Sequence, residues 1–274
     1  MDTFFVGKLI VAFVAGGLYI PFCVWATERF GSRFGGLLIG LPSTTLISFL
    51  FIAWTQDSNA AVMAAAITPA ALAASGFFLV EFFHFYHLQR KMMTFLGIFL
   101  WFALILPLVI YKITDIRISL LIAVPLLAIL LFYFRKHPNR KLDKVKAEND
   151  FMYRFVFSGS VIMVAVYLGK TLGPIWGGVF AAFPAAFMTS FILLDQNHGK
   201  TFSIAAAKSA IYGTIATILF AVVFYYAVPV LGLILGTMIA YLAAVGTALL
   251  MNKFILIKIK EEVVKSDTSF QPGR

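Results

Sequence analysis

Long runs of apolar residues, separated by short polar stretches, follow one another along most of the chain. Nine of these runs predict helices, and they cover residues 4–26, 34–54, 60–86, 92–113, 117–134, 152–170, 175–194, 202–227 and 230–252. Most are close to the roughly 20 residues that a helix needs to cross a bilayer. A lipid-exposed strand would leave its backbone unpaired, and the runs lack the alternation of a barrel strand. The pattern therefore predicts an all-α integral membrane protein, in which Pro229 alone separates the last two helices.

Composition supports this class. Residues of the set AVILMFWYC make up 61 % of the 274 residues, and charged residues make up 12 %. Soluble domains contain about 45–50 % apolar and about 25 % charged residues, so a water-soluble fold and a disordered chain are both excluded. The single cysteine, Cys23, cannot form an intramolecular disulfide. The four histidines form no metal motif, and no nucleotide-binding or hydrolase motif is present. We expect no cofactor, no metal and no enzymatic activity.

The basic residues indicate which side of the membrane each loop faces. A net charge of +10 would suggest a nucleic-acid partner in a soluble protein, but cytoplasmic loops of membrane proteins collect Lys and Arg, so we expect no such partner. The longest loop, near 135–150, is strongly basic. If this loop is cytoplasmic and successive loops alternate between the two sides, four of the 22 basic residues fall on the outer side. These are Lys8, Lys112, Arg117 and Lys170. This predicts a multi-pass protein of the cell membrane with an external N-terminus and a cytoplasmic C-terminus.

An internal repeat is visible without gaps. Residues 13–49 align with residues 155–191 at a constant offset of 142, with eleven of 37 positions identical. The identical positions include residues that commonly break helices, which are Gly31, Gly35, Gly36 and Pro42, paired with Gly173, Gly177, Gly178 and Pro184.

The repeat predicts how the chain is divided. Two four-helix units, 1–114 and 151–253, are joined by a linker helix and basic loop at 115–150 and followed by a tail at 254–274. Five helices separate the starts of the two units, and this odd number predicts that the units have inverted topology, as in many secondary transporters.

Each unit contains a proline near the middle of its second helix. Pro42 and Pro184 lie about 12 Å and 13 Å into their helices at 1.5 Å per residue, close to half the thickness of the bilayer core. A helix that restarts at such a proline points unpaired amides at the protein centre and attracts anionic or polar groups. We therefore predict a substrate site formed by Pro42, Ser43, Thr44, Thr45, Ser48, Pro184, Thr189 and Ser190.

A simpler interpretation of the same residues stays open. Proline kinks are common in membrane helices, and Ser or Thr hydroxyls often bond to the backbone one turn back. The pairs Gly35-Gly36 and Gly177-Gly178 are candidate helix breaks, or serve close packing alone.

Ionisable residues within the apolar runs are candidates for coupling. Glu81 is the acidic residue clearly inside a predicted span, and Lys208 occupies the corresponding helix of the second unit. Charged groups inside a membrane span are energetically unfavourable, so such residues are usually functional. Glu81 and Lys208 could form an ion pair, or Glu81 could carry a coupling proton with His84 nearby. The alternative is that these side chains extend to the interface. The four tryptophans, among them Trp101, fit belts at the membrane surface.

A family resemblance supports the two-unit interpretation. The segments GGLLIGLPSTTLISF and GGVFAAFPAAFMTSF resemble the second helix of small bacterial membrane proteins of the GlpM type and related families of unknown function. The resemblance implies that single units assemble as antiparallel dimers and that this chain fuses two of them.

These features favour a secondary transporter of a small solute that works by alternating access, with proton coupling as an option. Two alternatives remain: an ion channel built from inverted repeats, and a lipid-handling factor in membrane assembly. The expected partners are the lipid bilayer, a small solute or ion, and a second copy of the chain as an open option.

Overall fold

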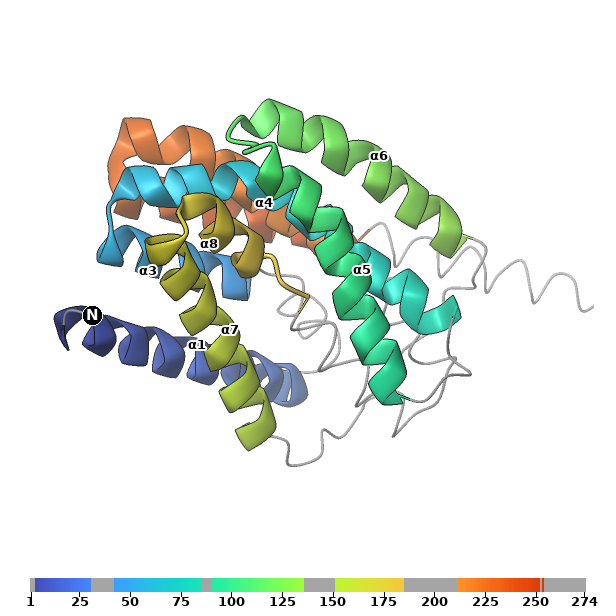
Figure 1. The fold of residues 1–274 in the computed structure, drawn as a ribbon, viewed down its shortest axis with the longest axis horizontal. Coiled ribbons are helices and arrows are strands. Elements are labelled where there is room, and N and C mark those ends of the chain that lie inside the picture. Colours follow the sequence, from blue (N-terminus) through green and yellow to red (C-terminus); the bar gives the residue numbers. More distant parts are fainter. Residues whose placement is uncertain are drawn as a thin grey trace, which may run out of the picture.

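The computed structural model describes residues 3–30, 42–84, 90–135, 151–184, 211–251 and 253, and every secondary-structure element in these ranges is a helix (Figure 1). The labelled helices are α1 (Thr3–Phe30), α3 (Ser43–Thr55), α4 (Ser58–His84), α5 (Arg90–Ile110), α6 (Ile116–Arg135), α7 (Phe151–Thr171) and α8 (Pro174–Ala181). Residues 211–251 are also helical. Among the described residues, four helical segments are long and apolar enough to cross a membrane: Ser58–Phe78, Ile116–Arg135, Phe151–Thr171 and Ile211–Met251.

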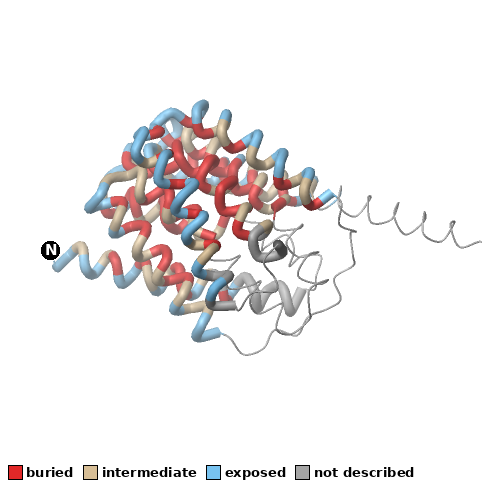
Figure 2. Tube along the Cα trace, turned by 45° about the vertical axis from the view of Figure 1, so that its right-hand side comes forward, coloured by how far each residue is buried: buried red, intermediate tan, exposed pale blue. Residues whose placement is uncertain are grey.

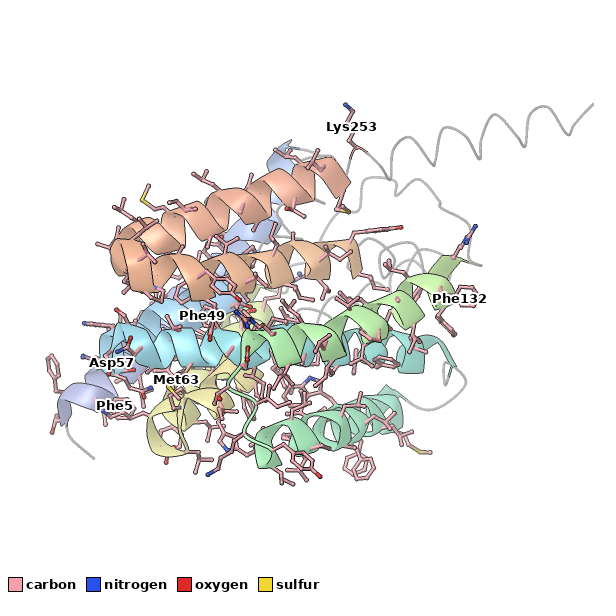
Figure 3. The ribbon with its side chains drawn as sticks, turned by 90° about the horizontal axis from the view of Figure 1, so that it is seen from above. Phe5, Phe49, Asp57, Met63, Phe132 and Lys253 are labelled. Atoms are coloured by element: carbon pink, nitrogen blue, oxygen red, sulfur yellow. The ribbon has the colours of Figure 1, made fainter. Side chains whose placement is uncertain are left out.

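Helix α4 forms the centre of the bundle and packs against α3, α5, α6 and α8. Its buried face consists largely of alanines, including Ala64 and Ala71, which allow neighbouring backbones to approach closely. Figure 2 shows the buried positions gathered in the interior, with exposed ones on the outer helices. Phe49 of α3 lies inside, 4.9 Å from the ring of Phe224, whereas Phe132 of α6 points outward (Figure 3).

Large apolar side chains cover the outside of the bundle. They are exposed along α5, α6 and the 211–251 segment, with Leu121, Ile234 and Leu242 among the most exposed. A soluble monomer rarely exposes so much contiguous apolar surface. Together with the long apolar helices, this surface identifies an all-helical protein suited to a membrane.

Helices α1 and α7 cross in antiparallel directions. Phe22 and Phe151 line one surface cavity, while a Cβ on Gly17 would lie 2.8 Å from the Phe155 carbonyl oxygen. Residues later in α1 therefore contact residues earlier in α7, as expected for antiparallel helices.

The α1–α7 contacts are also reciprocal. A Cβ on Gly159 would lie 2.5 Å from the carbonyl oxygen of Phe13, which mirrors the approach of Gly17 to Phe155. The rings of Phe13 and Phe155 meet edge to face at 5.5 Å between centroids. Phe13 and Phe155 are 142 positions apart, and so are Gly17 and Gly159. The helices thus touch through the same residues of the two aligned segments.

The 211–251 segment folds back on itself. Gly232 has a positive φ of 78°, and Ala216 and Ala248 belong to one buried cluster, although a straight helix would separate them by about 48 Å. A Cβ on Gly236 would lie 2.7 Å from the Cα of Val228. The chain therefore turns next to Pro229, where the sequence predicts the boundary between the last two helices.

The predicted helices and the observed ones coincide within the described ranges. The exceptions in length are the second and seventh predicted helices: α3 covers only the end of 34–54, and α8 covers only the start of 175–194. Pro42 and residues 182–184 of these spans are described and are not helical. The rest of both spans, and residues 202–210 of the eighth predicted helix, lie outside the described part of the chain.

Candidate functional site

A helix end lies close to each of the two prolines. Pro42 is the N-cap of α3, its side chain makes no capping hydrogen bond, and its carbonyl accepts a hydrogen bond of 2.8 Å from the Leu46 amide. Helix α8 ends at Ala181, and Phe183 and Pro184 are not helical. Both prolines are buried. Proline explains both positions, because it has no amide to donate and its ring clashes with the preceding turn.

The start of α3 and the end of α8 contact each other. The Thr45 hydroxyl donates a hydrogen bond of 3.3 Å to the Ala181 carbonyl, and the Thr44 hydroxyl approaches the same oxygen at 3.5 Å. About two turns further along α3, Ile52 packs against Gly177 of α8. Helices α3 and α8 are therefore antiparallel neighbours, with the N-terminus of α3 beside the C-terminus of α8.

Hydroxyls of α4 complete the carbonyl end of α8. Ser75 donates to the Ala182 carbonyl at 2.6 Å, and the Thr68 hydroxyl lies 3.5 Å from the Gly178 carbonyl. The indole of Trp101 donates to Ser75 at 2.9 Å. Carbonyls that would be orphaned at the buried end of α8 thus have partners.

Trp101 corrects one expectation from the sequence. Its side chain is not on the outer surface of the bundle, where a residue of an interfacial belt would meet the lipid: only 2 % of it is exposed, and its ring packs edge to face against Phe180 and Phe183. Its indole N–H finds a partner in Ser75, and this hydrogen bond makes a buried position favourable. Sequence reasoning missed Thr68 and Ser75, although their spacing of seven residues places them on one face of α4 and could have indicated a shared neighbour.

Ser48 stands out within the site. The residue is 0 % exposed, and its Oγ has no hydrogen-bond partner among the described residues; the other buried side-chain atom in this state is Nε2 of Gln56. Thr45, one turn earlier, is 1 % exposed. The structure therefore brings Pro42, Thr44, Thr45 and Ser48 to one place together with the end of α8 before Pro184, while Ser43 is partly buried as the first residue of α3.

The remaining predicted residues are only partly described. Gly177 and Gly178 lie buried in α8. Glu81 and His84 belong to the last turns of α4, but their side chains lie outside the described part of the structure. The other predicted positions fall wholly outside it, and these are Gly35, Gly36, Thr189, Ser190 and Lys208.

Two lysines bind the opposite end of α3. The Lys8 ammonium donates to the Trp54 carbonyl at 2.6 Å, and the Lys170 ammonium lies 3.5 Å from the Thr55 carbonyl. Cations are favourable at a helix C-terminus, where carbonyls lack partners. Both lysines are among the four basic residues that the sequence places on the outer side, so the ends of α1, α3 and α7 that carry them gather at one end of the bundle.

No group of three or more His, Cys, Asp or Glu residues that could hold a metal ion occurs within the described ranges. What the site offers instead is helix-end amides, hydroxyls and carbonyls. These groups bind polar or charged solutes through hydrogen bonds.

Comparison with protein families gives a match to the second half of the chain. Residues 151–259 match the family described as "Protein of unknown function (DUF3147)". The match begins at the first residue of α7 and spans the whole second predicted unit, 151–253. Resemblance to a family of unknown function thus holds for the second half of the chain, but no comparison supports the GlpM type itself. No curated protein and no solved structure matches significantly.

Proposed function

We propose that the chain is a secondary transporter of a small solute, built from two inverted four-helix units, 1–114 and 151–253, joined by the linker helix α6. The units rock against each other around a site at the helix breaks, so that the site opens to each side of the membrane in turn. Inverted repeats with discontinuous helices near the bilayer midplane are the architecture of many such carriers.

The reciprocal crossing of α1 and α7 is the observation that carries this proposal. In a two-fold arrangement, residue i of one copy contacts residue j of the other, and j contacts i. Gly17 with Phe155 and Phe13 with Gly159 follow this rule at the offset of the repeat. Phe13 also contacts its own equivalent, Phe155, as expected of residues beside a pseudo-two-fold axis. Because the helices are antiparallel, such an axis would run across them, in the plane of a membrane that they span.

The family match supports the division into units. A family profile that covers residues 151–259 alone describes a segment of one unit's length, as expected if the second unit is a module that also occurs singly. The first unit then is a diverged copy, related to the second through the alignment of 13–49 with 155–191.

We place the solute site at the meeting of α3 with α8, and proton coupling at Glu81, with His84 and Lys208 as its candidate partners. The external N-terminus and cytoplasmic C-terminus follow from the basic residues, in the cell membrane. A second copy of the chain is not needed for this mechanism, because one chain supplies both units.

Uptake into vesicles tests the transport proposal. The purified chain in proteoliposomes is expected to take up a small solute with saturable kinetics, faster when the pH gradient is imposed. Glu81→Gln is expected to abolish the response to the gradient, since an amide cannot carry the proton. Asp57→Asn is the matched control: Asp57 caps the first turn of α4 at 2.8 Å from the Ala60 amide, and asparagine caps equally well. Non-saturating currents would favour a channel, and a co-purifying lipid without solute uptake would favour the assembly factor.

Cysteine labelling tests the inverted topology. In a Cys23→Ser background, Phe30→Cys is expected to react with an impermeant maleimide only from the cytoplasm, and Leu172→Cys only from outside. The two positions are equivalent at the offset of 142, so inversion requires opposite sides. Tyr111→Cys and Lys253→Cys serve as the outer and inner references. Reaction of both equivalent positions from one side would overturn the inverted arrangement.

A further inference from the structure

Ser48 lacks the local hydrogen bond that many helical hydroxyls of this protein make. In eight described cases, the hydroxyl of a helical Ser or Thr donates to the carbonyl four residues earlier, and the residues are Thr55, Thr68, Ser75, Ser158, Thr171, Thr217, Thr237 and Thr247. This local bond is the usual way to satisfy a hydroxyl inside an apolar helix. Ser48 is fully buried and has no partner among the described residues. Leaving a buried hydroxyl unpaired is unfavourable, and a bound ligand that accepts its hydrogen bond would remove this cost.

Helix geometry places Ser48 on the face of α3 that carries Thr44 and Thr45 of the N-terminal turn. In an α-helix the Cα–Cβ bond tilts toward the N-terminus, and residues three and four apart share a face. Ser48 therefore lies one turn below Thr44 and Thr45, on the face that these residues turn toward α8. Ile52, on the same face, packs against Gly177, so Ser48 lies between two points at which α3 contacts α8.

The N-terminal turn itself has donors to offer. The amides of Ser43, Thr44 and Thr45 have no acceptor inside the helix, and the N-cap, Pro42, provides no side-chain cap. The turn is also buried, because Pro42 and Thr45 are both buried. A buried, uncapped helix N-terminus is a favourable site for negative charge.

The neighbouring end of α8 brings only the partial negative charge of its carbonyls to this turn, not a full anionic charge. Its last carbonyls already accept hydrogen bonds from Thr45 and Ser75, at Ala181 and Ala182 respectively. We propose that the first turn of α3, with Ser48, binds the oxyanion of a small solute, a carboxylate or a phosphate. That the bound solute is also transported rests on the proposed function, whereas the binding itself does not.

Equilibrium binding to the full chain tests the inference without transport. The purified protein is heated in sodium acetate, sodium phosphate, sodium chloride or a bulky sulfonate buffer at equal sodium concentration, and the melting temperature is recorded against anion concentration. Acetate or phosphate is expected to raise the melting temperature of the unaltered chain more than that of Ser48→Ala, since a ligand that binds only the folded state stabilises it, whereas exclusion of the anion from the surface acts on both chains alike. Which oxyanion acts distinguishes a carboxylate site from a phosphate site.

Ser48→Ala is expected to weaken the apparent affinity about tenfold, as expected for the loss of one hydrogen bond to a charged group. Ser48→Thr keeps a hydroxyl and is expected to bind within about threefold of the unaltered chain. Thr237→Ala is the matched control, because Thr237 is a mostly buried helical hydroxyl that bonds to Leu233 at 2.6 Å, and it should leave the affinity unchanged.

The outcomes separate this inference from the transport proposal. Oxyanion binding that depends on Ser48 without any uptake would support the site and refute the carrier. Saturable uptake of a cationic or neutral solute, with no stabilisation by either oxyanion, would support the carrier and overturn the site. Equal affinities for Ser48→Ala and the unaltered chain would also overturn it, as would stabilisation by chloride alone.

Discussion

Replacing Gly178 by alanine is expected to lower the free energy of unfolding by about 3 kcal/mol, because α8 lies directly on the backbone of α4 at this residue. A Cβ at Gly178 would collide with the Ala64 carbonyl oxygen and would lie 2.8 Å from the Ala64 carbonyl carbon. On its other side the new methyl meets Ile67 at 2.8 Å. A flexible side chain could move aside, but a helix backbone cannot, so α8 must shift away from α4.

The measurement is the melting temperature of detergent-solubilised protein, followed by the loss of the monodisperse size-exclusion peak after heating. A decrease of ~10 °C corresponds to the expected free energy for a domain of this size. Gly7→Ala and Gly246→Ala are matched controls, since each adds the same methyl to a helix with nothing within 4 Å. Both should melt at the same temperature or slightly higher, because alanine favours helix over glycine by about 1 kcal/mol. If Gly178→Ala melts with the controls, α8 does not pack on α4 as described.

The fold could be predicted from the sequence where a long apolar run has one clear physical consequence. Residues 116–135 and 151–171 are such runs, and both are helices within a residue or two of the expected bounds. The turn beside Pro229 was also predictable, because proline interrupts a helix and Gly232 can adopt the positive φ that the turn needs. In these segments local chemistry and tertiary structure require the same conformation.

The candidate site could be predicted only in part. Proline spacing and the repeat pointed to Pro42 and Pro184, but sequence cannot show which hydroxyls find partners. Thr45 and Ser48 have similar surroundings in the sequence, yet Thr45 bonds across to Ala181 and Ser48 bonds to nothing described. Trp101 was misplaced for the same reason, since its position depends on Ser75 of another helix. Contacts between segments far apart in the sequence determine which of these side chains are paired, and such contacts cannot be predicted from hydrophobic periodicity.

Alanine at Gly17 and alanine at Gly159 are expected to destabilise the protein by similar amounts, about 2 kcal/mol each. Each new methyl meets the backbone carbonyl of the opposite helix: Phe155 in the first case, at 2.8 Å, and Phe13 in the second, at 2.5 Å. Each also meets the ring of that same phenylalanine, which is already held by the edge-to-face contact between the two rings. Because the two glycines have equivalent surroundings, the two substitutions should destabilise the protein equally.

The double substitution makes the test specific to a shared crossing. Because Gly17 and Gly159 lie in one interface, the first methyl separates α1 from α7 and leaves more room for the second. The double variant is therefore expected to lose less than the sum of the two single losses, by about 1 kcal/mol, whereas distant sites add. Gly17→Ala combined with Gly178→Ala supplies the additive comparison, since these residues contact different helices. A large cost at one glycine and none at the other, measured by the same melting assay, would show that the two contacts are not equivalent, and the pseudo-two-fold axis on which the transport proposal depends would be lost.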